Sequence, residues 1–552
     1  MTTRFSHDSG SVLIVTIAVT GILSLLVGVA FTVATQAIRA AGHTEHVHGA
    51  LAAAEAGLDD YIFRLNDIDE YWTYDHNSPG PDNNPAFVAD ATVVAIDDPA
   101  WTPVPGGGEF GEYVYSVDTS RLPSEGVISI TSTGRVRPPD GATEANNQYA
   151  QRTVTAVVKQ SSFLDFLYFT DFETLDPIAY STVADRTWAA ANCSVHRWVT
   201  ERPSGCTDIT WANDDRVNGP FHTNDRWRIS GSPEWTDDVS GSAIDLGFYT
   251  GSGTPVFGGG TPFYQAPLEM PPSNAQLRVL ADHNGSGEGC LFTGPTSIIM
   301  NANGTLRIDS PYTRASGNGC GTFSGAGNDS PQTIALPSNG VVYVQAIPAN
   351  PADPNYTAGC PFGNNGLGYP ISLAGGFVDD TPYSCRDGDV FIEGTLDGRL
   401  TVAAENDINI TWHLLYDGTD DMLGLIANDF VQIYHPVDVS QSDSLENLNA
   451  APNHPGARFR NPQINAAILS VSHSFMVPFW NQGDNNLGTI TVNGAIAQIY
   501  RGPVGTFSGS SQVTGYDKDY NYDARLRYTN PPHFIDPVKA SWRILQFAEQ
   551  FD

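Results

Sequence analysis

The feature that most constrains this chain is an uncharged apolar stretch near its N-terminus, residues 10–38, with the sequence GSVLIVTIAVTGILSLLVGVAFTVATQAI. At about 1.5 Å per residue, a helix over this stretch is roughly 40 Å long, longer than the roughly 30 Å of hydrocarbon in a bilayer. The apolar core of a secretory signal has only about 7–15 residues. The stretch therefore predicts a retained membrane-spanning helix.

The helical pattern continues beyond the membrane edge. The chain from residue 40 to residue 66 is rich in Ala and Leu, and its first later proline is Pro79. Ala and Leu favour helix. Apolar residues at three- and four-residue spacing give this segment a single apolar face, namely Leu51, Ala54, Leu58, Ile62 and Leu65. We predict one helix over residues 11–66, half in lipid and half against a soluble domain.

This plan resembles the type IV pilins and pseudopilins. A short polar leader ends at Gly10, a long uncharged helix follows, and the extension ALAAAEAGLDDYIFRLN is similar to the N-terminal domain of PilX-type pilus assembly proteins of actinobacteria. The resemblance implies a leader of residues 1–10 that a prepilin peptidase cleaves between Gly10 and Ser11. In two respects the chain departs from the common pattern: Arg4 is the leader's one basic residue, and Val15 takes the fifth mature position, where most pilins have Glu.

The resemblance also implies partners and a location. The partners are the membrane, the prepilin peptidase and other pilin subunits, and the head would meet a surface glycan or a host or cell surface. We expect a single-pass protein of the cell membrane with its N-terminus cytoplasmic and the rest extracellular. Because Val15 cannot neutralise a neighbouring subunit's terminal ammonium, we expect a minor subunit at the pilus tip. The simpler alternative is an ordinary single-pass anchor.

Charge excludes one class of partner. Lys and Arg number 27 against 61 Asp and Glu, a net charge of −34, and the lysines are Lys159, Lys518 and Lys539. No basic patch is available to neutralise a phosphate backbone, so nucleic acid is a poor partner. A strongly acidic surface with many turn residues (Gly 54, Pro 37) suits a β-rich extracellular protein.

Six cysteines all lie beyond the membrane helix. An even number in an exported region predicts disulfides, and we expect sequence neighbours to pair because each pair brackets a Gly- or Pro-containing loop. No pair has the two-residue spacing of a zinc or redox motif, so we expect no metal. The candidates are Cys193, Cys206, Cys290, Cys320, Cys360 and Cys385.

The region after the helix, residues 67–160, predicts a small antiparallel sheet. Segments 112–120, 126–136 and 151–160 alternate apolar and polar residues and are separated by turn clusters. Packed on the apolar face of the helix, they would form a pilin-like head.

Residues 161–515 contain many short apolar runs separated by Gly, Asn and Asp. This pattern of short apolar runs favours a parallel β-helix-like solenoid over the alternative, a β-sandwich, whose strands are usually longer and alternate more regularly. A solenoid needs a cover on its last turn, so we predict that the tail, residues 516–552, contains a capping helix that starts at Asp536 and Pro537.

A β-helix could also be a carbohydrate-active enzyme, because many such enzymes have this fold. Acidic doublets could act as acid and base or bind structural calcium, but neighbouring residues on a strand point to opposite faces, and no motif supports calcium. The histidines at 43, 46 and 48 do not complete a metal site. We therefore predict a non-enzymatic, cofactor-free, pilin-like structural and adhesive protein; the alternative is a membrane-anchored carbohydrate-active β-helix. The doublets are Asp214 with Asp215, Asp237 with Asp238, Asp379 with Asp380, and Asp420 with Asp421.

Overall fold

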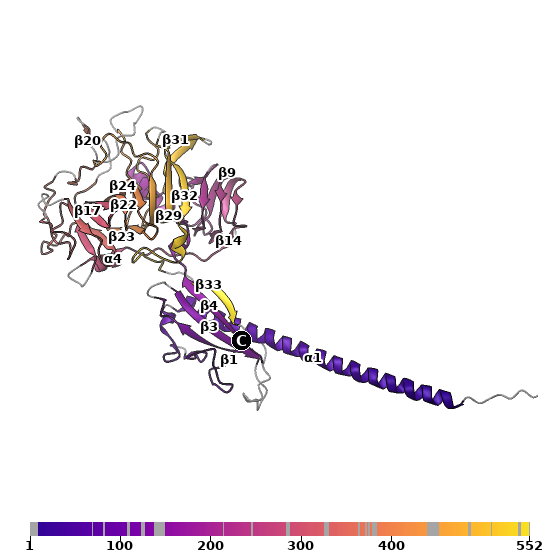
Figure 1. Cartoon of the computed structure of the whole chain (residues 1–552). Helices are drawn as coiled ribbons and strands as arrows, with labels where there is room; N and C mark the ends of the chain where they lie inside the picture. The colour runs from indigo at the N-terminus through magenta and orange to yellow at the C-terminus, as the bar shows by residue number, and fades with distance from the viewer. Residues whose placement is uncertain are drawn as a thin grey trace, which may run out of the picture. The chain divides into compact units, whose positions relative to one another are not determined.

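The chain forms two compact units in the computed structural model. The first contains residues 1–160 and 541–552, and the second contains residues 161–540 (Figure 1). The structure describes residues 9–550 except 69, 81–82, 107–110, 123–126, 137–149, 214, 244–246, 283–287, 325–330, 363–364, 370–371, 374–375, 378–382, 439–451, 484–486, 509–510 and 539–541; within the first helix the side chains of residues 9–14 and 37–43 are also outside the description. The predicted leader lies outside the described residues as far as residue 8.

A single helix, α1 (Ser9–Asp67), forms the start of the first unit. The stretch Val15–Gln36 is long and apolar enough to cross a membrane and, within the described residues, is the one helix that meets this test. Its apolar side chains are exposed; Leu25 and Phe31 each retain 71% of their accessible surface. Hydroxyl groups inside the stretch donate to carbonyls one turn earlier, as Thr20 does to Thr16 at 2.8 Å, so these hydroxyls do not depend on water for a partner.

The second half of α1 packs on an antiparallel sheet. The buried face of the helix carries Ala50, Ala54, Leu58, Tyr61 and Leu65. It includes three residues of the predicted face, whereas the other two, Leu51 and Ile62, are only half-buried. Short 3₁₀ turn η1 (Tyr71–Thr73) follows the helix. The sheet has the order β1-β2-β3-β4-β33, with strands β1 (Thr102–Pro103), β2 (Gly111–Asp118), β3 (Val127–Val136), β4 (Gln151–Gln160) and β33 (Trp542–Gln550).

The C-terminal segment is a strand, so the predicted capping helix is wrong. β33 runs antiparallel to β4, from Trp542 opposite Gln160 to Gln550 opposite Thr153, and Figure 1 shows β33 in yellow beside β4. Pairing gives the otherwise open edge of β4 its backbone hydrogen bonds. Trp542 is buried in the core of this unit, and its backbone N–H donates to Asn66 Oδ1 at 2.7 Å.

The second unit is a stack of parallel strands. Its longest ladder pairs ten strands, each parallel to the next, in the spatial order β15 (Cys290–Thr293), β19 (Val341–Gln345), β23 (Arg399–Ala404), β25 (Met422–Ala427), β27 (Gln463–Ser470), β29 (Thr489–Tyr500), β5 (Tyr168–Phe172), β8 (Phe221–Thr223), β11 (Val239–Gly241) and β14 (Phe263–Tyr264). Successive turns of chain lie over one another in this arrangement, as in a solenoid, whereas a β-sandwich is antiparallel. We call this unit the parallel stack.

Three further ladders complete the walls of the parallel stack. One contains β16 (Thr296–Asn301), β22 (Val390–Leu396), β24 (Ile408–Tyr416), β26 (Val431–Ile433) and β28 (Phe475–Met476). Another continues from β29 to β32 (Asp517–Tyr522), β7 (Arg216–Asn218), β10 (Glu234–Trp235) and β13 (Val256–Phe257). The last joins β6 (Thr210–Trp211), β9 (Trp227–Gly231) and β12 (Tyr249–Gly253). Because β32 belongs to the parallel stack, the predicted boundary at residue 515 is wrong and the unit ends at residue 540.

The order of turns in the parallel stack differs from their order in the chain. β5, the first strand of the unit, pairs with β29, one of its last strands, with Tyr168 opposite Ile496. Figure 1 accordingly shows the magenta strands β9 and β14 beyond the yellow β32. The chain thus enters at the middle, builds one end as far as β14, and returns along the outside to begin again at β15.

The return segment covers the outer face of the longest ladder. It contains α4 (Ala275–Ala281) and packs Leu268 and Leu277 against that face, where Ile426 and Leu469 lie. Asn274 fixes its position, since its Nδ2 donates to Ala404 O at 2.7 Å and Ile426 O at 3.0 Å. An antiparallel pair, β17 (Thr305–Asp309) and β18 (Gln332–Ala335), extends β16. Two small hairpins are β20 (Ser372–Leu373) with β21 (Gly376–Phe377), and β30 (Gly505–Ser508) with β31 (Ser511–Gly515).

Candidate functional site

A long excursion leaves the parallel stack between β5 and β6. It spans residues 173–209, and we call it the braced excursion. It contains a 3₁₀ turn η4 (Pro177–Ala179) and the helix α3 (Val183–Asn192). Thr182 caps α3, since its Oγ1 accepts the Asp185 N–H at 3.1 Å, a common N-terminal signal. The helix ends at Cys193, where a disulfide begins.

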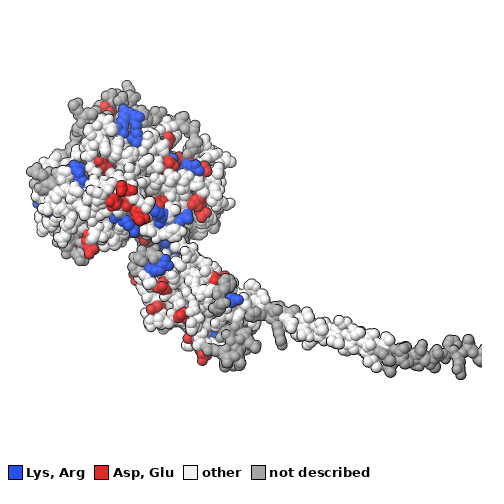
Figure 2. Space-filling model, viewed as in Figure 1, with Lys and Arg blue, Asp and Glu red and all other residues white. Residues whose placement is uncertain are grey.

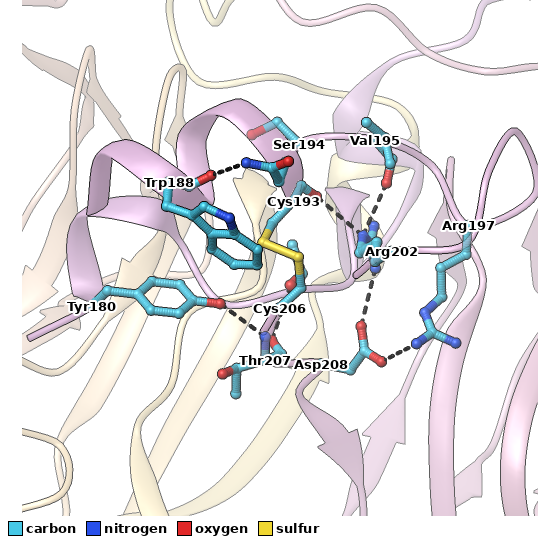
Figure 3. Close-up of a disulfide and its surroundings, with 12 residues drawn as sticks. Tyr180, Trp188, Cys193, Ser194, Val195, Arg197, Arg202, Cys206, Thr207 and Asp208 are labelled. Atoms are coloured by element: carbon cyan, nitrogen blue, oxygen red, sulfur yellow. Dashed lines mark hydrogen bonds and ion pairs between the residues drawn. A yellow bond between two sulfur atoms is a disulfide. The ribbon is translucent and has the colours of Figure 1, made fainter. Parts of the chain in front are cut away.

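Covalent and ionic links hold the braced excursion in place (Figure 3). A disulfide joins Cys193 to Cys206. Between the two cysteines, the Arg202 guanidinium donates to the carbonyl oxygens of Cys193 at 3.1 Å and Val195 at 2.9 Å. The Asp208 carboxylate accepts from Arg202 at 3.2 Å, and Figure 3 shows that it also faces Arg197. The excursion is therefore fixed although it lies outside the ladders.

Two fully buried carboxylates connect the braced excursion to the parallel stack. Asp225, just after β8, contacts Arg202 and accepts the backbone N–H groups of Glu173 at 3.0 Å and Arg197 at 2.7 Å. Glu173 pairs with Arg501 at 3.3 Å. Burial raises the pKa of Glu173, and the charge of Arg501 opposes that rise. A buried ion pair of this kind keeps its partners in one geometry, because losing either leaves an uncompensated charge.

A cavity of about 120 Å³ adjoins these pairs. Its walls include Trp211, Trp480 and Phe507 together with the charged residues Asp215, Arg501 and Lys518. The Arg501 guanidinium stacks on the Trp211 ring at 3.7 Å, and Lys518 Nζ lies 2.7 Å from Asp215 Oδ1. Burial lowers the pKa of Lys518, while Asp215 acts in the opposite direction. We call this cavity the aromatic pocket.

A second buried charge cluster lies along one corner of the parallel stack. Asp389 is buried and accepts from Asn406 Nδ2 at 2.6 Å. Burial raises its pKa to about 7, and the neighbouring carboxylates of Asp387 and Asp429 contribute. Burial also raises the pKa of Asp407 well above its ordinary value. Further along the corner, His473 contacts Asp176 at 3.0 Å.

This corner makes the stability of the second unit depend on pH. A carboxyl whose pKa is higher when folded holds a proton that the unfolded chain has lost, so its contribution falls as pH rises from about 4 through 7. We expect the free energy of unfolding to decrease between pH 5 and pH 8, and Asp389→Asn to reduce that decrease by about 2 kcal/mol. Urea unfolding at each of these two pH values measures the free energy of unfolding. The exposed Asp420→Asn is the control; equal slopes in wild type and Asp389→Asn would contradict the assignment.

The structure places the residues predicted from the sequence as follows. Cysteines pair between sequence neighbours, as predicted: Cys193 with Cys206, Cys290 with Cys320, and Cys360 with Cys385. Gly10 and Ser11 lie in α1, and their side chains are outside the description.

The members of the acidic doublets that the structure describes do not converge on one site. Asp214, Asp379 and Asp380 lie outside the described residues. Asp421 fixes a turn by accepting the N–H groups of Gly398 at 2.7 Å and Gly418 at 2.6 Å, while Asp215 faces the aromatic pocket. Within the described part of the chain, no three His, Cys, Asp or Glu side chains are grouped to hold a metal ion.

Sequence reasoning missed the aromatic pocket. Trp211 precedes Arg501 and Lys518 by about 300 residues in the chain, and the three meet because β5 pairs with β29 and β7 pairs with β32. One signal was present: Lys518 is the first lysine after Lys159. A lone lysine in a long acidic, lysine-free region is a candidate for a specific partner.

Comparisons with known proteins add little. No family model matches the chain, and no curated protein matches it. Among solved structures, the competence-associated pilin ComZ from Thermus thermophilus aligns over 92% of this chain and 98% of its own, with 12% sequence identity and a TM-score of 0.26. A TM-score this low does not establish a common fold.

Proposed function

We propose that this chain is a membrane-anchored, minor pilin-like subunit that displays a structural and adhesive head from a type IV pilus or a related surface assembly. The observation that carries the proposal is α1. One uninterrupted helix of 59 residues presents an exposed apolar half and then becomes the spine of an antiparallel sheet. The exposed half needs a lipid or helical neighbour, because water solvates apolar side chains poorly.

Two further features support a minor rather than a shaft-forming subunit. Val15 is 59% exposed and carries no charge, so it offers no carboxylate to a neighbour's terminal ammonium. The sheet is also interrupted in the chain by the 380 residues of the second unit, which enter after β4 and return before β33. A head of this size would crowd a continuous shaft, and we propose that the subunit has low copy number.

We also propose that the head is not an enzyme. The carboxylates nearest the aromatic pocket, Glu173 and Asp215, are each committed to an ion pair, with Arg501 and Lys518 respectively. A general acid or base needs a carboxyl that is free to exchange a proton with substrate. This pairing supports a binding role for the head.

The N-terminus of the mature protein tests the proposal. We expect the protein recovered from producing cells to begin at Ser11, because the resemblance implies cleavage after Gly10, and we expect Gly10→Val to retain the leader. Gly21→Val is a matched control, since a side chain added at Gly21 meets no atom within 4 Å, and it should be processed normally. N-terminal mass spectrometry gives the result. A wild-type protein that begins at Met1 or Thr2 would leave only the plain-anchor interpretation.

A further inference from the structure

We propose that the aromatic pocket binds one uncharged pyranose ring, such as the terminal sugar of a surface glycan. The inference deepens the adhesive role within the proposed function and rests on it. It is drawn from the size of the pocket, the pairing of its charges, its aromatic walls and the rigidity of its surroundings.

The size of the pocket limits the ligand to part of one sugar ring. Its volume is about 120 Å³, less than the roughly 150 Å³ of an engineered cavity in another protein that holds one benzene molecule, and a pyranose with its hydroxyl groups is larger than benzene. Pockets for larger ligands are typically about 300–1,000 Å³. A pyranose would therefore insert one edge into the pocket and leave the rest of the ring, and any further sugar, outside.

The charges of the pocket fit an uncharged ligand. Its two cations and the two nearest anions form complete pairs, Arg501 with Glu173 at 3.3 Å and Lys518 with Asp215 at 2.7 Å. An anionic ligand would have to displace a buried carboxylate from its cation, which is costly. A cationic ligand would be repelled by Arg501 and Lys518, which both lie over the Trp211 ring, at 3.7 Å and 5.5 Å from its centre.

The walls offer both kinds of contact that a sugar needs. Trp480 and Phe507 provide aromatic faces for the apolar C–H face of a ring, and Phe507 is 38% exposed in the structure. Lys518 has three N–H donors, of which the pair with Asp215 uses one. The hydroxyl-bearing side chains of Thr207 and Thr210 also line the pocket. Hydroxyl groups of a ring can both donate to the carboxylate and accept from the ammonium.

The walls are fixed before a ligand arrives. Trp211 follows the braced excursion, whose disulfide and buried ion pairs hold it, and Arg501 and Lys518 belong to or adjoin ladder strands β29 and β32. A preformed pocket avoids the entropy cost of ordering side chains on binding. On the face of the molecule seen in Figure 2, most atoms belong to uncharged residues, and Lys and Arg occur in small separate groups.

Ligand titration of the full chain in lipid nanodiscs tests the proposal. The probes are the methyl pyranosides of glucose, galactose, mannose and N-acetylglucosamine, followed by Trp fluorescence and saturation-transfer NMR. Glucuronate and tetramethylammonium serve as anionic and cationic comparators. We expect at least one methyl pyranoside to bind more tightly than either comparator. Phe507→Ala should weaken that binding at least tenfold, and so should Lys518→Met.

Phe263→Ala is the matched control, because Phe263 is a similarly exposed aromatic residue of β14 outside the pocket. This variant should bind the methyl pyranoside with the affinity of the wild type. Failure of all four methyl pyranosides to bind would overturn the proposal. So would tighter binding of glucuronate or tetramethylammonium, or equal affinities in Phe507→Ala and Phe263→Ala. The titration does not require leader cleavage, so a negative N-terminal result and a negative sugar result are independent.

Discussion

Asp225→Ala is expected to lower the free energy of unfolding of the second unit by about 3–5 kcal/mol. Asp225 is fully buried, and so is the Arg202 guanidinium that it contacts; the side chain of Arg202 is only 1% exposed. The substitution leaves a buried cation that shares one remaining carboxylate, Asp208, with Arg197. It also removes the acceptor for two backbone N–H groups, and unsatisfied buried donors are costly.

Urea unfolding of the full chain in nanodiscs, followed by Trp fluorescence, measures this loss. Glu234→Ala is the control, because Glu234 forms an exposed ion pair with Arg216 at 3.5 Å, and exposed pairs contribute only about 0–1 kcal/mol. The double variant Asp225→Ala with Arg202→Met should recover some of the loss, since the cation leaves with its partner. A loss below about 1 kcal/mol for Asp225→Ala would contradict the buried-pair account.

Local patterns in the sequence were sufficient to predict the elements whose partners are near in the chain. The α1 helix follows from its period of three to four residues, and β2, β3 and β4 follow from alternation between turn clusters. The cysteines also pair as predicted from the Gly- or Pro-containing loop between each two sequence neighbours, and the bridges close loops of 13 to 30 residues.

The C-terminal strand could not be predicted from its own residues. The segment WRILQFAEQ places Trp542, Leu545 and Ala548 at helical spacing. A register shift between Ile544 and Gln546 also interrupts strict alternation in β33. What decides its conformation is the open edge of β4, almost 400 residues earlier. Strand pairing of this kind is set by a partner and not by local propensity.

The aromatic pocket also depends on a connection between distant parts of the chain. The sequence indicates short strands but not that β5 follows β29 in the spatial order, because hydrogen bonds between backbones carry no residue-specific signal. That pairing, together with the pairing of β32 with β7, brings Trp211 to Arg501 and Lys518. Of the acidic doublets that the sequence did suggest, Asp421 stabilises a turn, whereas Asp215 faces the aromatic pocket and pairs with Lys518.

Gly134→Ala is expected to lower the free energy of unfolding of the first unit by about 2–3 kcal/mol. Gly134 lies in β3 directly under α1, where small residues let the helix backbone touch the sheet. A Cβ atom at this position would lie closer than 3 Å to backbone atoms of Ala50, Ala53 and Ala54. Backbone atoms cannot rotate away as a side chain can, so the helix must move off the sheet, and Leu58 and Tyr61 would lose some of their packing.

Hydrogen exchange of β3 and β4 in the full chain, with and without the substitution, measures this loss locally. Gly111→Ala is the matched control in the same sheet, since the nearest atom to its added Cβ is a methyl group of Val104 at 3.3 Å, which can shift. It should change stability by less than about 1 kcal/mol, because alanine also restricts the unfolded chain. Equal protection in the two variants would mean that the helix does not rest on Gly134. In that case the close fit between α1 and the sheet, on which the pilin-like interpretation depends, would be wrong.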